Sequence, residues 1–241
     1  MSRSSCSKLI SCSILHGAYG LGATIGPLIA TAMVTRGGLS WYSYYYLMVG
    51  CAVAQIVVGI PAFRSATAAR FRLTHPAQAD GKSRTREALT YGVTWIVAIF
   101  LTLYVGVEVG LGGWLVTFML EVRSGEPFAS GLVATGFWLG LTMGRVFLGF
   151  VTGRIGEKLA IVIYLLTSVA LELLFWLIPS FVSSAIFAGF LGFFLGPLFP
   201  AAIIVLTRLL PTRLHVSAVG FVAAIGSAGA AAMPFAIGAI A

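Results

Sequence analysis

The chain has 241 residues, of which 59% are hydrophobic and 9% are charged, and its mean hydropathy is +1.00. A soluble globular protein carries about 25% charged residues because its surface must be hydrated. The composition therefore excludes a soluble globule, a disordered tail, a coiled coil and a collagen-like chain. The net charge of +8 does not indicate nucleic-acid binding, since the basic residues fall between apolar runs, where they mark membrane topology. We expect the chain to lie mostly in a lipid bilayer.

Seven apolar runs are long enough to cross the hydrocarbon core, which requires about 20 apolar residues in a helix. None of them alternates with a period of two, which argues against a membrane β-barrel. The sequence therefore predicts an all-α fold, a polytopic membrane bundle of about seven transmembrane helices. The predicted spans are residues 9–34, 39–63, 89–120, 128–151, 159–178, 181–207 and 214–241.

The basic residues predict the orientation of these spans. If the N-terminus is cytoplasmic, all 15 Lys and Arg except Arg36 and Arg123 lie on the cytoplasmic side, as the positive-inside rule requires. We therefore predict a multi-pass membrane protein with its C-terminus on the opposite side. A basic cytoplasmic linker, residues 64–88, divides the chain into two spans in residues 1–63 and five in residues 89–241. Topology explains the charge of this linker, and attraction of anionic lipid is the alternative.

Small residues recur every four positions along the first span, so one face of this helix lacks bulk and a neighbouring backbone can approach it. Gly22 and Gly26 belong to this face, and Pro27 is expected to bend the helix. The pattern indicates either a gating element or simple tight packing. His16, in the same span, could relay protons or make an ordinary packing hydrogen bond.

The third span contains four glycines around a lone acid, Glu108. Because glycine weakens a helix by up to about 1 kcal/mol relative to alanine, we predict a break or a distortion between Gly106 and Gly113. An acid at membrane depth costs about 2.5 to 3.5 kcal/mol on insertion scales, so Glu108 should face a cavity or a partner. The alternative is a position near the outer interface. The residues assigned to a substrate or proton pathway are Glu108, His16, Trp114 and Tyr104.

Later spans add residues for gating or packing. Arg145 is expected to clamp the next helix, to pair with Glu157, or to anchor the span at the interface. Glu172, in the fifth span, is expected to extend toward the outer interface. The glycines and prolines of the sixth span predict a bent helix able to expose carbonyl groups. The set assigned to gating or helix packing is Gly22, Gly26, Pro27, Arg145, Gly149, Arg154, Gly196 and Pro197.

Motifs of common enzymes are missing from the sequence. There is no phosphate-binding GxxxxGK[ST], no HExxH, no GxSxG and no His/Cys spacing suited to a metal, so we expect no enzyme activity, no metal and no cofactor. The three cysteines have no spacing that indicates a disulfide framework. A membrane chain with polar residues and flexible helices, but without an enzyme motif, is most simply a carrier.

Three segments resemble the major facilitator superfamily, particularly its fungal members. LHGAYGLGATIGP, residues 15–27, is similar to the glycine-proline motif of the fifth helix in that family, and YVGVEVGLGGW, residues 104–114, to its seventh helix. Residues 149–158 are similar to the loop motif between helices eight and nine, with Gly153 in place of the usual aspartate. The resemblance implies that residues 15–241 correspond to helices five to eleven of a twelve-helix carrier, and hence that the chain is truncated.

The leading functional hypothesis is secondary transport of a small polar solute, for example a sugar, that is either proton-coupled or facilitative. Glu108 is the expected proton or substrate residue, because protonation removes the cost of burying its charge. The first alternative is a non-transporting subunit that pairs with a further membrane chain. A seven-helix receptor is the second, although the predicted cytoplasmic N-terminus argues against it. Substrate, coupling mode, organelle and oligomeric state stay open.

Overall fold

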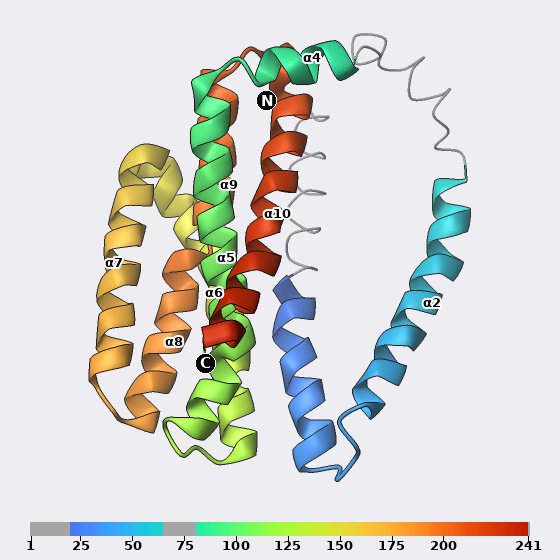
Figure 1. Cartoon of the computed structure of the whole chain (residues 1–241), viewed down its shortest axis with the longest axis vertical. Helices are drawn as coiled ribbons and strands as arrows, with labels where there is room; N and C mark the ends of the chain where they lie inside the picture. The colour runs from blue at the N-terminus through green and yellow to red at the C-terminus, as the bar shows by residue number, and fades with distance from the viewer. Residues whose placement is uncertain (1–19, 65–80, 241) are drawn as a thin grey trace.

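A computed structural model describes residues 20–64 and 81–240 of the chain (Figure 1). Every regular element in these ranges is a helix. After a first helix at Gly20–Thr35, the elements are α2 (Ser43–Phe63), α4 (Gly81–Ala88), α5 (Gly92–Glu121), α6 (Pro127–Ile155), α7 (Glu157–Leu177), α8 (Phe181–Leu195), α9 (Leu198–Leu209), a short 3₁₀ turn η2 (Thr212–Leu214) and α10 (His215–Ile240). His16 and most of the linker lie outside the described residues.

Six helices of the described chain are long and apolar enough to span a membrane. They are α2, α5, α6, α7, the α8–α9 pair taken together, and η2 with α10. The first predicted span is described only from Gly20 onward, as a shorter apolar helix. The all-helical, polytopic membrane fold predicted from the sequence is therefore confirmed, and the six spans fit a multi-pass membrane protein in contact with lipid.

Local sequence explains where the long helices begin and end. The Glu126 carboxylate accepts hydrogen bonds from the backbone N–H groups of Phe128 and Ala129, and Pro127 occupies the first turn, so α6 begins with a side-chain cap. At its other end Gly156 has a φ of 90°, a conformation that glycine adopts without steric cost. This residue ends α6 and lets α7 start at once in a new direction.

Helix pairs approach closely where one of them carries glycine. A Cβ on Gly144 of α6 would overlap the Phe193 carbonyl oxygen of α8, and one on Gly192 of α8 would overlap the Phe137 carbonyl oxygen of α6. The same relationship joins α10 to α5, where a Cβ on Gly229 would overlap the Thr102 carbonyl oxygen. In lipid, such backbone contact replaces the hydrophobic driving force between helices. The closest backbone contacts of the bundle are therefore those between α6 and α8 and between α5 and α10.

Helix α5 is continuous from Gly92 to Glu121, so the predicted break between Gly106 and Gly113 was wrong. Packing explains the difference: Gly106 and Gly110 lie against Met233 and Ile237 of α10. These glycines provide room for α10 instead of weakening the helix. A break here would also leave backbone groups without hydrogen bonds in an apolar environment, where each costs several kcal/mol.

Helix α2 stands apart from the rest of the bundle (Figure 1), and none of its residues is buried. Its entry carries the exposed aromatic side chains of Trp41, Tyr42, Tyr45 and Tyr46, which meet one another in edge-on contacts. Amphipathic rings of this kind concentrate at membrane–water interfaces. Because no residue of α2 is buried in the described part of the chain, its surface fits contact with lipid.

The predicted linker is not wholly irregular, because its last eight residues form α4. Thr94 Oγ1 donates to the Ala88 carbonyl at 2.8 Å, which holds the turn from α4 into α5. Glu87 of α4 also forms an ion pair with Arg213 of η2. These contacts fix α4 against the start of α10 at the end of the bundle.

Candidate functional site

A buried ion pair joins α5 to α6 inside the bundle. Arg145 Nη2 lies 3.1 Å from Glu108 Oε1, and the two side chains are 17% and 6% exposed. The expectation that Glu108 faces a partner is confirmed. Because α5 is 30 residues long and rises 1.5 Å per residue, Glu108 lies about 24 Å from its N-terminal end, near the middle of the span. Glu108 therefore lies well away from both ends of α5.

The ion pair adjoins the point where the α8–α9 span is interrupted. Arg145 Nε donates to the Gly196 carbonyl at 3.3 Å, and the Tyr104 hydroxyl donates to the Leu195 carbonyl at 3.0 Å. Pro197 follows, and it has no N–H to continue the helical hydrogen-bond pattern. Side chains of α5 and α6 thus bond the carbonyl groups at the interruption. The sixth span is interrupted at Gly196 and Pro197, within the stretch whose glycines and prolines predicted a bent helix.

Tyr104, Glu108 and Arg145 form one polar cluster in an apolar interior. Tyr104 and Glu108 are four residues apart on α5, so they share one helix face, and both are buried. The cluster contains a hydroxyl, a carboxylate and a guanidinium next to an interrupted helix. These groups can bind a proton, donate hydrogen bonds to a polar molecule or accept them from one.

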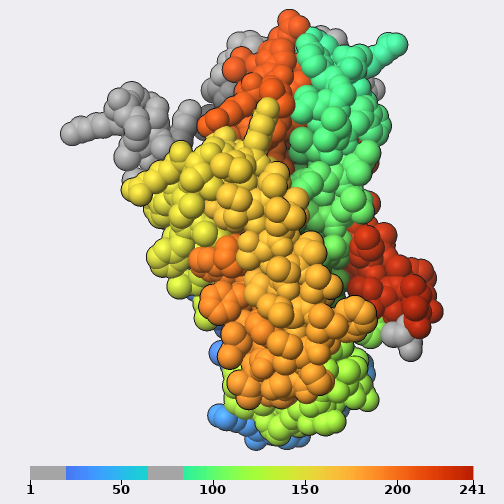
Figure 2. Space-filling model, turned by 90° about the vertical axis from the view of Figure 1, so that its left-hand side faces the viewer, coloured from blue at the N-terminus to red at the C-terminus, as the bar shows by residue number. Residues whose placement is uncertain are grey.

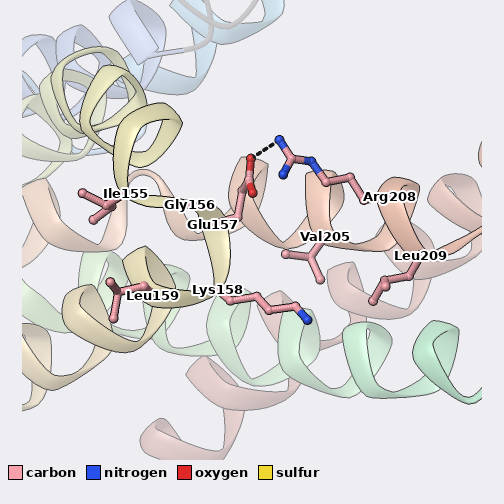
Figure 3. A pocket seen from close by; sticks show the side chains of 8 residues that line it. All are labelled: Ile155, Gly156, Glu157, Lys158, Leu159, Val205, Arg208 and Leu209. Atoms are coloured by element: carbon pink, nitrogen blue, oxygen red, sulfur yellow. Dashed lines mark ion pairs between the residues drawn. The ribbon is translucent and has the colours of Figure 1, made fainter.

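The partners predicted for Arg145 were wrong, because Glu157 pairs instead with Arg208 of α9, at 2.7 Å (Figure 3). Arg145 lies 10 residues before the end of α6, about 15 Å along the helix axis, whereas Glu157 starts α7. A guanidinium cannot span that distance. Arg145 therefore turns inward to Glu108, and the role of an interface anchor is also excluded.

Trp114 does not join the polar cluster. Its indole N–H donates to the Pro234 carbonyl of α10 at 3.1 Å, so it binds one of the carbonyl groups near the proline of that helix. Trp114 and Tyr104 do line a common apolar cavity of about 730 Å³. Both residues assigned to a substrate or proton pathway therefore line one cavity, but only Tyr104 belongs to the polar cluster.

This cavity, here called the lateral groove, is bounded by α5, α7, α8 and α10. In Figure 2, α7 faces the viewer and the dark red end of α10 projects to its right. Two polar atoms on α7, Ser168 Oγ and Glu172 Oε2, are buried without a hydrogen-bond partner. Glu172 and Ser168 both line the groove, and the expected extension of Glu172 toward the outer interface stays a prediction.

The glycines predicted for gating in the first helix make few contacts. A Cβ on Gly22 would meet no atom within 4 Å, and one on Gly26 would lie 3.3 Å from the Tyr44 hydroxyl. The helix packs on α6 through other residues: Gly20 against Thr142, and Thr31 against Gly131. Residues 20–35 are helical throughout, so Pro27 does not end the helix.

Of the other gating candidates, Gly149 would meet no atom within 4 Å if it carried a Cβ, and Arg154 is exposed in the last turn of α6. Sequence reasoning missed Arg123, which was assigned only to the outer side. Its guanidinium donates to Ser184 Oγ at 3.0 Å and to the Phe175 carbonyl at 2.8 Å. The sequence offered one signal for this role: Arg123 is a basic residue that follows directly after a predicted span, where it can bond the ends of neighbouring helices.

Comparison with known proteins gives one relative. Bypass of stop codon protein 6 from Saccharomyces cerevisiae is 32% identical over 257 aligned residues, which cover 95% of this chain and 51% of the yeast protein. The chain thus spans about half the length of the curated relative that it matches. No protein-family model matches the sequence.

These findings overturn the assignment to the major facilitator superfamily, including its fungal branch and the correspondence to helices five to eleven. The relative's name is not that of a transporter of this superfamily, and no family model supports the assignment. The motifs have a more general cause. Gly106 and Gly110 make room for a neighbouring helix, and any closely packed membrane bundle favours small residues in such places.

Proposed function

We propose that the protein takes part in the transmembrane transport of a small polar solute, by a secondary process that is proton-coupled or facilitative. The observation that carries the proposal is the buried Glu108–Arg145 pair beside the interrupted α8–α9 span. Ionisable residues in the membrane interior are costly, and they commonly belong to substrate or proton pathways. Interrupted helices at membrane depth are likewise common at transport sites.

The cluster offers a way to couple binding to helix movement. With Glu108 ionised, Arg145 holds α5, α6 and the Gly196 carbonyl together. Protonation of Glu108, or a solute that competes for Arg145, would weaken the link between α5 and α6. The equilibrium between two packings would then shift by the difference in binding free energy between them. This supports a carrier whose conformation responds to a proton or a solute.

The chemistry of the cluster favours a solute with several hydroxyl groups. Glu108 accepts hydrogen bonds, Arg145 donates them, and the Tyr104 hydroxyl can do both. A sugar-like molecule presents matching groups at close spacing. The walls around the cluster are apolar, as expected for a site that recognises its ligand through a few polar groups.

The test is uptake of radiolabelled D-glucose into proteoliposomes that contain the purified chain, with and without an inward proton gradient. We expect Glu108→Gln to abolish the dependence of uptake on external pH, because an amide cannot take up the proton. Glu121→Gln is the matched control, since Glu121 lies on the same helix but is exposed at its end. Unchanged pH-dependent uptake by Glu108→Gln would contradict the assignment of this residue.

The orientation is part of the proposal: the N-terminus is cytoplasmic and the C-terminus lies on the opposite side. Arg84, Arg154, Arg208 and Arg213 belong to α4, the last turn of α6, the end of α9 and η2, and these parts of the helices all lie toward the upper end of the bundle in Figure 1. The positive-inside rule would place that end in the cytoplasm. Glycosylation-site tags at each end of the chain test this, and a glycosylated N-terminal tag would contradict it.

A second candidate is a non-transporting subunit that binds a further membrane chain. The lateral groove favours it, because its lining on α5 runs from Phe100 to Phe118, about 27 Å along the axis. That is close to the thickness of the hydrocarbon core, about 30 Å, and so to the length of one transmembrane helix. Co-purification with a defined membrane chain, together with no uptake in proteoliposomes, would support this candidate over transport.

A further inference from the structure

A second hollow lies at the basic end of the bundle, separate from the Glu108–Arg145 cluster. It has a volume of about 450 Å³ and lies between the turn from α6 into α7 and the end of α9. Figure 3 shows the Glu157–Arg208 ion pair on one side and Lys158 extending along the other, toward Leu209. Here this hollow is called the basic-end hollow.

Positive charge predominates around the basic-end hollow. Glu157 is its one acid, and Arg208 already pairs with it while remaining 67% exposed. Lys158 lines the hollow, and Arg154 lies in the last turn of α6, two residues before the Gly156 that separates α6 from α7. Across residues 20–64 and 81–240, neither Lys158 nor Arg154 has an ion-pair or hydrogen-bond partner. Lys158 and Arg154 therefore carry positive charge that no acid in these ranges neutralises, since the nearby Glu157 is paired with Arg208.

Exposed apolar side chains adjoin these cations. Ile155, Leu159 and Leu209 line the hollow and are 40%, 55% and 52% exposed. Leu159 and Leu209 belong to α7 and α9, two elements of membrane-spanning helices, so they lie where a span leaves the hydrocarbon. A ligand that fits this surface is anionic at one end and apolar at the other. The arrangement matches a phospholipid better than a soluble anion.

We propose that the basic-end hollow binds the headgroup of an anionic phospholipid. Its phosphate lies beside Lys158, with Arg154 adding positive charge from the end of α6, and one acyl chain follows Leu159 and Leu209. Basic pockets between transmembrane helices recognise headgroups in this way, since each Lys or Arg near the surface contributes about 1 kcal/mol to attraction of anionic lipid. The start of α7 adds to this attraction, because Gly156 makes no side-chain cap and helix N-termini carry partial positive charge.

The test uses native mass spectrometry of the full chain in detergent, titrated with phosphatidylglycerol or with phosphatidylcholine of the same acyl composition. We expect the wild-type chain to retain phosphatidylglycerol in preference. Lys158→Gln should lower its retention about fivefold, and Lys158→Gln with Arg154→Gln further, at about 1 kcal/mol for each charge. Lys158→Arg should restore it, because the charge is kept. Arg86→Gln, at an exposed position on α4, is the matched control and should leave retention unchanged.

Two further arms separate a lipid site from a site for a free anion. Leu209→Ser should lower phosphatidylglycerol retention if an acyl chain follows this residue. Glycerol 3-phosphate, which lacks acyl chains, should not displace the lipid at equal concentration. The proposal is overturned if glycerol 3-phosphate displaces it fully, or if the double Gln variant retains as much lipid as the wild type. Equal loss in Arg86→Gln would also overturn it, because general surface charge would then suffice.

Discussion

Arg145 and Glu108 neutralise each other inside the bundle, with 3.1 Å between Nη2 and Oε1. Arg145 also donates a hydrogen bond to the Gly196 carbonyl. The pair therefore connects three spans, α5, α6 and the interrupted α8–α9. The pair should therefore contribute to the stability of the bundle, because a buried charge that loses its partner is strongly destabilising.

Removing one member of this pair should destabilise the protein strongly. Glu108→Leu leaves the Arg145 guanidinium buried without its counter-charge, and the expected loss in the free energy of unfolding is about 3 to 5 kcal/mol. Arg145→Leu should cost at least as much, because the Gly196 carbonyl also loses a donor. The double variant should recover much of the loss. Unfolding by sodium dodecyl sulfate in mixed micelles measures all four states of the cycle.

The exposed pair Glu87–Arg213 provides the control, with side chains 36% and 64% exposed. Single replacements there should change the free energy of unfolding by at most about 1 kcal/mol. If Glu108→Leu is as mild as Glu87→Leu, water must reach the Glu108–Arg145 pair. The bundle would then be more accessible to water around this pair than the burial of the two side chains indicates.

Replacing Gly144, the glycine of α6 at the contact with α8, should destabilise the protein. Gly144→Ala would place a methyl group on the Phe193 carbonyl oxygen, and the resulting separation of the helices should lower the free energy of unfolding by about 1 to 3 kcal/mol. Gly149→Ala is the control on the same helix, where no atom lies within 4 Å. Alanine there should be neutral or stabilise by up to about 1 kcal/mol. Thermal unfolding of both variants in detergent gives the comparison, and equal effects would contradict it.

The sequence predicted the helices well because their signal is local. Apolar length alone identifies a span, and the interruption at Gly196 and Pro197 follows from the missing N–H of proline. Glu108 was correctly expected to have a partner, because burying its charge alone is too costly. These predictions needed no knowledge of which helices are neighbours.

The predictions that failed all depended on neighbours. Gly106 was taken as a sign of a break, but the approach of α10 gives this glycine a packing role. Arg145 was matched to the nearest acid in sequence, Glu157, whereas its partner Glu108 is 37 residues away. A pattern of glycines does not show which neighbouring helix packs against it. A pattern of charges does not show which oppositely charged residue is close enough to form an ion pair.

Arg123 should hold the end of α7 in place. Its guanidinium bonds Ser184 Oγ and the Phe175 carbonyl and lies 5.1 Å from the centre of the Phe118 ring. Arg123→Gln should therefore lower the free energy of unfolding by about 1.5 to 3 kcal/mol, the range for hydrogen bonds to charged groups. Hydrogen exchange should also become faster at residues 175–178. Arg123→Lys should rescue only part of the loss, because lysine lacks the planar fork. Exchange unchanged in both variants would contradict this role.

Glu172 should lower the stability of the isolated chain. Its Oε2 atom is buried without a hydrogen-bond partner in a groove whose other lining residues are mostly apolar. An unsatisfied buried polar group costs about 1 to 3 kcal/mol, so Glu172→Leu should raise the free energy of unfolding by about that amount. Glu121→Leu, at an exposed position near the end of α5, should have little effect on it.

The same variant also distinguishes the two candidate functions. If a further membrane helix fills the lateral groove, a donor on that helix can satisfy Glu172, and Glu172→Leu should weaken the association while stabilising the chain alone. If the groove holds only lipid, association with any membrane chain should be unchanged and only the gain in stability should appear. Measuring unfolding of the isolated chain beside energy transfer to a labelled candidate partner in vesicles separates these results. Loss of stability in the isolated chain would show that Glu172 already has a partner within it.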